Sequence, residues 1–173
     1  MPFASRTESS IDAELKFQRP ELAQFLSYWD TKRAERLFPA RDDIIPREIQ
    51  NLLPWVHMYR MYDVLGPLQD GNFDAAAGVD FCIRLVGTGL AEFFGETDFR
   101  GKPISTLPSP SAENLRGHLT RLLQARAPIR TFNLHTSIPN QEFQGSEGCY
   151  APLSSDGARI DMIIAVTMLE LRK

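Results

Sequence analysis

Residues 80–101, DFCIRLVGTGLAEFFGETDFRG, decide the fold of this chain because an apolar strand runs directly into glycines and a short helix. The branched and aromatic side chains at 81–86 predict the strand. Gly87 opens the helix, which we expect to end at Gly95 because glycine interrupts helical runs. A strand followed by short helices can form one wall of a ligand chamber.

Residues 148–171 supply the matching wall, and they predict antiparallel strands. Asp156-Gly157 is a strong hairpin signal, and it joins a strand at 143–153 to a strand at 159–171. A further strand is expected at 129–138. The last strand is apolar on both alternating faces, which is typical of a strand covered from both sides.

The chain begins with a polar stretch, residues 1–10, that we expect to be frayed. A helix is predicted over 20–37, because Leu22, Phe25, Leu26 and Trp29 repeat at helical spacing. This helix has only the sheet against which to bury its aromatic side chains.

The remaining elements follow from prolines and periodicity. Asp43 is the expected N-cap of a short helix over 46–53. The other expectations are a strand at 55–64, an exposed linker at 65–79 and the clearest helix of the chain at 111–126.

Bulk properties narrow the class of protein. The chain has 173 residues, 43% of them hydrophobic and 24% charged, which predicts one globular domain. A net charge of −3 argues against nucleic-acid binding, and no apolar run has the length of a membrane span. Cys82 and Cys149 form no paired motif, so a reducing, cytoplasmic location is expected.

Three segments, in order, resemble a bacterial single-domain PAS family of the PAS_5 type. They are Tyr28-Trp29-Asp30 with Arg33, residues 39–46 (PARDDIIP) and Leu53-Pro54; Phe81, residues 84–88 (RLVGT), Phe94-Gly95 and Gly101; and residues 150–157 (YAPLSSDG). The resemblance covers the chain from about Tyr28 to Leu171. The long 65–79 connection and Ile45 depart from the family pattern.

The resemblance implies an α+β fold with a five-stranded antiparallel sheet in the order 2-1-5-4-3. Helices would cover one face, and an N-terminal helical extension, residues 1–53, would cover the other face of a core at 54–173. It also implies a non-enzymatic sensory or signal-relay module that acts in trans on a signalling protein partner, with homodimer formation as an option. Neither nucleic acid nor membrane is an expected partner.

The chamber of such a domain lies between the sheet and the short helices. The residues expected to line it are mostly apolar: Phe93, Phe94, Leu107, Leu115, Leu119, Phe132, Leu134, Tyr150, Met162 and Ile164. They would hold a small apolar ligand, or simply fill a core that has no ligand. Arg33, Arg41 and Arg84 offer either an anion or partner site or structural ties to nearby acidic residues.

The cofactor is unknown from the sequence. Haem on His118 is disfavoured, because this histidine falls at the edge of the apolar stripe of its helix and is expected to be half-exposed. A photoreactive flavin is also disfavoured, since both cysteines fall in strands.

The rival class is a small α+β enzyme that acts on an apolar substrate in the same chamber. Tyr150, His135 or His118 pointing inward beside a carboxylate would favour that class.

Overall fold

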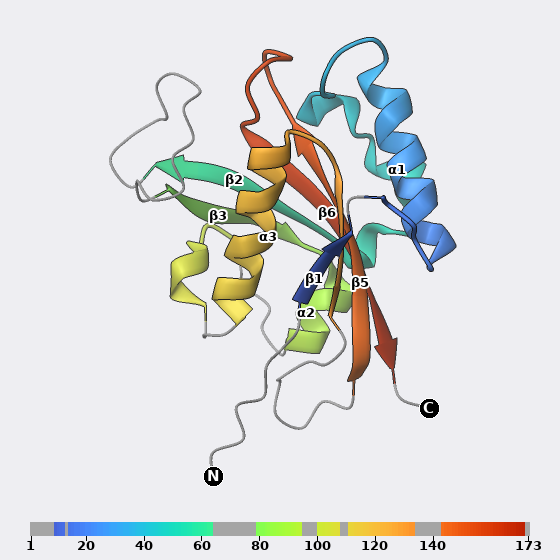
Figure 1. Ribbon diagram of the computed structural model, residues 1–173, viewed down its shortest axis with the longest axis vertical. Helices are drawn as coiled ribbons and strands as arrows, with labels where there is room; N and C mark the ends of the chain where they lie inside the picture. The colour runs from blue at the N-terminus through green and yellow to red at the C-terminus, as the bar shows by residue number, and fades with distance from the viewer. Residues whose placement is uncertain are drawn as a thin grey trace.

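The computed structural model of the chain describes residues 9–12, 14–63, 79–94, 100–107, 111–133 and 143–171. A six-stranded antiparallel sheet organises them (Figure 1). The strands are β1 (Ser9–Asp12), β2 (Val56–Asp63), β3 (Val79–Val86), β4 (Ile129–Asn133), β5 (Phe143–Leu153) and β6 (Met162–Leu171). The α-helices are α1 (Pro20–Arg33), α2 (Thr88–Phe94) and α3 (Ser111–Ala125), with short 3-10 turns η1 (Arg41–Asp43), η2 (Pro46–Ile49), η3 (Leu53–Trp55) and η4 (Ile104–Thr106). None of the described helices combines the length and the apolar character needed to cross a membrane.

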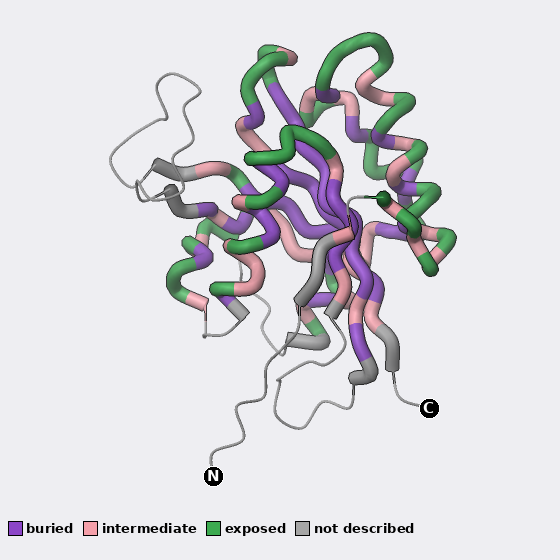
Figure 2. Tube along the Cα trace, in the orientation of Figure 1, coloured by how far each residue is buried: buried purple, intermediate pink, exposed green. Residues whose placement is uncertain are grey.

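The strand order is β1-β4-β5-β6-β2-β3. Without β1, the five remaining strands have the expected order 2-1-5-4-3, which confirms that prediction. The C-terminal strand β6 lies between β5 and β2 and pairs with both. Figure 2 shows β5 and β6 buried over most of their length, as expected for strands covered on two sides.

The register of the strands separates the two faces of the sheet. Tyr150 on β5 lies opposite Ala165 on β6, which in turn lies opposite His57 on β2, so the three share one face. The ring of Tyr150 contacts His118, and this is therefore the face that α3 covers (Figure 1). Glu147 on β5 has the opposite parity, and its carboxylate contacts the start of α1 on the other face.

Helix α1 begins at Pro20, whose missing N–H is harmless in the first turn. Leu22, Phe25 and Trp29 are buried against β5 and β6, as their spacing predicts. The indole Nε1 of Trp29 donates to the carbonyl oxygen of Pro152 over 2.8 Å. The helix is shorter than the predicted 20–37, because Ala34 leaves helical geometry with φ of 52°.

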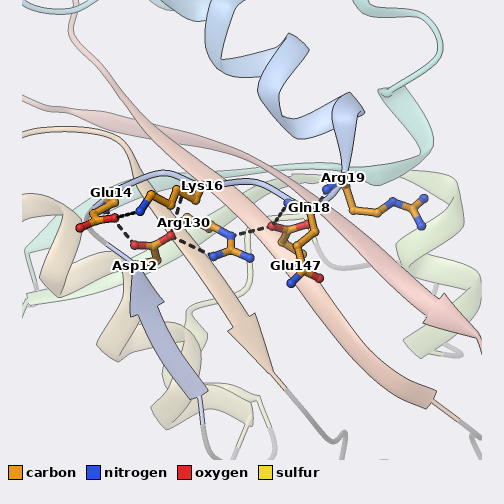
Figure 3. A network of polar contacts seen from close by, with 7 residues as sticks. All are labelled: Asp12, Glu14, Lys16, Gln18, Arg19, Arg130 and Glu147. Atoms are coloured by element: carbon orange, nitrogen blue, oxygen red, sulfur yellow. Dashed lines mark hydrogen bonds and ion pairs between the residues drawn. The ribbon is translucent and has the colours of Figure 1, made fainter.

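The expectation of a frayed N-terminus is wrong for Ser9 and Ser10, which belong to β1 and pair with β4. Asp12 at the end of β1 accepts a hydrogen bond from Nη1 of Arg130 over 2.9 Å (Figure 3). Arg130 also donates to Glu147, whose carboxylate oxygens accept the backbone N–H groups of Gln18 and Arg19. This chain of charged contacts ties β1 and the entry to α1 to the sheet.

The segment after α1 also differs from its prediction. Asp43 does not cap a helix over 46–53; its carboxylate instead accepts the backbone N–H of Ala40 within η1. Residue Ile45 precedes η2, and the expected helix is split into η2 and η3. Most of the predicted 65–79 linker and the end of the predicted 129–138 strand lie outside the described residues.

Candidate functional site

A cluster of polar side chains lies on the sheet beneath α3. Its centre is His57 on β2, which is 5% exposed. Nδ1 of His57 is 2.6 Å from the hydroxyl of Tyr59, and Nε2 is 2.8 Å from Oγ1 of Thr167 on β6. Both imidazole nitrogens therefore have partners, so the ring is held in one orientation.

Tyr150 on β5 extends the cluster across the sheet. Its hydroxyl forms hydrogen bonds with the side chains of Thr131 and Thr167, and its ring meets His57 edge to face at 5.3 Å between centroids. The backbone of Gly148 makes room for these groups, because a Cβ there would approach the Thr131 hydroxyl to 2.8 Å. The hydrogen-bond network thus joins strands β2, β4, β5 and β6.

His118 on α3 closes the cluster from the helix side. Its ring lies 5.6 Å from that of Tyr150 in an edge-to-face arrangement. The side chain is buried, at 5% exposure, so the expectation of a half-exposed histidine is wrong. The stripe of α3 that packs on the sheet is wider than the apolar positions alone indicated.

Burial keeps this cluster uncharged at neutral pH. Desolvation lowers the pKa of His57 to about 3, with a smaller contribution from His118, and lowers the pKa of His118 to about 4. Burial likewise raises the pKa of Tyr150 to about 12 and the pKa of Tyr59 well above its usual range. Two neutral imidazoles and two neutral phenols result.

These neutral side chains are suited to forming hydrogen bonds with one another or with a polar group of a ligand, rather than to proton transfer near pH 7. A carboxylate partner would raise the pKa of an imidazole, whereas both histidines show the reverse. Across the described ranges, no group of three His, Cys, Asp or Glu side chains is arranged to hold a metal ion.

The ten residues predicted to line a chamber lie in different places. Tyr150 and Leu119 are buried on the α3 side, and Leu115 and Leu107 are half-buried on α3 and beside η4. Phe93 and Phe94 belong to α2, but their side chains lie outside the described set, as does the whole of Leu134.

The other three predicted residues belong to the opposite face of the sheet. Phe132 lies opposite Glu147, and Ile164 lies opposite Ala151, one residue out of phase with Tyr150. Met162 shares the parity of Ile164. The sheet therefore separates these three side chains from Tyr150 and Leu119.

Sequence reasoning missed His57, Tyr59, Thr131 and Thr167. One signal was present, because His57 and Tyr59 stand two apart in a strand and must share a face. Their partner Thr167 is 110 residues away, and nothing local in the sequence brings them together.

The three arginines from the family-like segments are dispersed. Nε of Arg33 donates to Asp30 over 2.6 Å, and Nη1 of Arg41 donates to the carbonyl of Ile44 rather than to an acidic neighbour. Arg84 is exposed on β3. They do not converge on a common site.

Most of this architecture matches a known protein family. The family model PAS_5, described as a PAS domain, matches residues 17–163, which include α1, the polar cluster apart from Thr167, and the turn between β5 and β6. No curated protein gives a significant match. The matched range covers most of the chain, and the protein belongs to the PAS_5 family of PAS domains.

Proposed function

We propose that this chain is a cytoplasmic, non-enzymatic sensory or signal-relay module that acts in trans by binding a signalling protein. Membership of a PAS family supports a sensory or signalling role. Free Cys82 and Cys149 accord with a reducing compartment. The proposed organisation is a sensory core at 54–173 with residues 1–53 as an extension that presents α1.

The proposal rests on strand β6, which contacts the polar cluster beneath α3 on one face of the sheet and packs towards α1 on the other. Thr167 on β6 bonds to His57 on the α3 side, while Ile164 and Val166 of the same strand are buried on the α1 side. A rearrangement of the cluster would therefore shift the strand on which α1 packs. Tightly packed interiors transmit such displacements because they cannot absorb them.

The input in this proposal is a change at the polar cluster. A small, largely apolar ligand with one polar group would compete for the hydrogen bonds of His57 and Tyr150, while its body replaced side chains around Leu119. A partner that contacts α3 would act on the same groups without a ligand. In both cases the output is the surface that α1 presents.

Native mass spectrometry of the full chain, purified from its own host, tests the proposal. We expect a complex with a second protein that also forms from the two purified components, and no chemical change in a co-purified small molecule. A chain that carries no partner, and that converts a co-purified molecule on incubation, would contradict it. Tyr59→Phe should weaken the reconstituted complex, whereas Arg47→Gln, an exposed change on η2, should not.

A further inference from the structure

A groove runs along the edge of the buried face of α1. Leu22, Phe25 and Trp29 are buried, and Leu26 beside them is half-buried against the core. Trp29, Leu26 and the exposed Ala23 form an apolar strip that lines the groove. Leu37, which is 63% exposed, extends the same apolar strip beyond the helix end.

The groove runs between α1 and the turn that joins α3 to β4. Its volume is about 580 Å³, within the range of small-molecule sites. Leu15 and Phe17, on the segment leading into α1, line one end, and Pro128 lines the wall opposite the helix. This hollow lies on the α1 side of the sheet, separate from the polar cluster beneath α3.

The charges of the groove are unbalanced. Two arginines, Arg33 and Arg126, line the groove together with one carboxylate, Asp30. This carboxylate is already paired with Nε of Arg33. Arg126 has no carboxylate partner among the described residues; its Nη2 donates to the carbonyl of Ala158 over 2.6 Å. One net positive charge therefore borders an apolar floor, in a chain whose overall charge is −3.

Both guanidinium groups are held in place before any ligand arrives. The guanidinium of Arg126 lies 5.4 Å from the ring centre of Phe38, and that of Arg33 lies 6.0 Å from Trp29. Their remaining N–H donors can bind a carboxylate in the paired geometry that arginine favours. Pre-oriented donors reduce the entropy lost on binding.

We propose that this groove binds a free amphiphilic monoanion, an unbranched acyl chain with one carboxylate. The tail would lie along Leu26 and Leu37 on the apolar floor, and the carboxylate would meet Arg126 and the free N–H groups of Arg33. The single excess positive charge matches one anionic head, and the volume suits one short tail rather than the surface of a bilayer.

Three probes with the same eight-carbon tail test the inference: octanoate, 1-octanol and octyltrimethylammonium. Binding is followed by calorimetry and by Trp29 fluorescence in a Trp55→Phe background, where Trp29 is the remaining one of the two tryptophans. We expect octanoate to bind at least tenfold more tightly than the alcohol and the cation to bind weakest. Vesicles of phosphatidylglycerol should not shift the fluorescence.

Substitutions then locate the site. Arg126→Gln should weaken octanoate binding about tenfold, because a charge-assisted contact is lost. Leu37→Ser should weaken it about fivefold, because apolar contact is lost. Arg47→Gln, which also removes one exposed arginine, should leave binding unchanged, and circular dichroism should show all variants folded.

Equal affinity for octanoate and 1-octanol would overturn the proposal, because the arginines would then have no role. Binding that Arg126→Gln and Leu37→Ser both leave intact would also overturn it, as would a fluorescence response to vesicles alone. Light scattering that shows a dimer in which octanoate does not bind would instead assign the groove to a second copy of the chain. None of these outcomes depends on the identity of a signalling partner.

Discussion

Nε of Arg130 on β4 lies 2.6 Å from Oε1 of Glu147 on β5, and the two side chains are only 10% and 7% exposed. The same carboxylate accepts the backbone N–H groups of Gln18 and Arg19 where the chain enters α1. One buried ion pair thus fixes the N-terminal helix to the sheet.

Glu147→Gln should lower the free energy of unfolding by about 2 kcal/mol, because Arg130 keeps a buried charge with only Asp12 as a partner. Urea denaturation measures the change. Glu35→Gln, on an exposed residue, is the matched control and should alter stability by less than about 0.5 kcal/mol. Equal effects of the two substitutions would show that the ion pair does not hold α1.

The bond between His57 and Tyr59 can be measured with a double-mutant cycle. Tyr59→Phe leaves Nδ1 of His57 without its partner and should cost about 1 kcal/mol, while His57→Leu should cost more because Tyr59 and Thr167 both lose a bond. The double variant should be about 1 kcal/mol more stable than the sum predicts. Strict additivity would indicate that the two side chains are not coupled.

Stability should fall as the pH is lowered from 7 to 5. Both buried histidines have folded-state pKa values, about 3 and about 4, below the ordinary value of 6.5, so the unfolded chain binds more protons in this window. Together they should remove about 3–4 kcal/mol by pH 5. The carboxylates whose pKa values are lowered, such as Asp43, add their loss at lower pH.

The control for this pH dependence is His118→Asn. It should remove about half of the slope between pH 7 and pH 5, whatever its effect on stability at pH 7. A slope equal to that of the wild type would mean that His118 is not buried and neutral.

Three glycine substitutions test the packing around the site. Gly87→Ala should be the most damaging, at about 3 kcal/mol or more, because its Cβ would overlap the backbone carbonyls of Leu53 and Pro54. Gly148→Ala should cost about 1–3 kcal/mol by pushing on Thr131 and Thr167. Thermal unfolding measures the loss of stability in Gly87→Ala and in Gly148→Ala.

Gly117→Ala on α3 is the opposite case, since nothing lies within 4 Å of the added Cβ. It should stabilise the protein by about 0.5–1 kcal/mol through helix propensity. Destabilisation at this position would indicate that the outer face of α3 is packed.

The sheet was predictable because its signals are local. The two-sided apolar character of 159–171 and the Asp156-Gly157 turn placed the last hairpin, and the family-like segments supplied the strand order. Strand β1 was not predictable, because Ser9–Asp12 has a single apolar residue, and it pairs with the distant strand β4 and bonds through Asp12 to Arg130. An ion pair between residues far apart in the chain leaves no periodic pattern in the sequence from which it could be predicted.

The candidate site was predictable only in part. Apolar character selected Leu119 and Tyr150, which are buried on the α3 side, but it also selected Ile164 on the other face. A central strand is apolar on both faces, and its phase relative to α3 is a tertiary property. The threonines of the cluster were overlooked because their partners are distant in the chain, as in the contact of Thr167 with His57, 110 residues away.

Amide hydrogen exchange in α1 tests most directly whether the cluster beneath α3 is coupled to the helix on the other side of the sheet. Tyr59→Phe is compared with Ile160→Val, a buried substitution outside the cluster that should cost a similar amount, about 1 kcal/mol. We expect residues 22–33 to exchange at least threefold faster in Tyr59→Phe than in Ile160→Val. Identical exchange of α1 in the two variants would contradict a relay through β6.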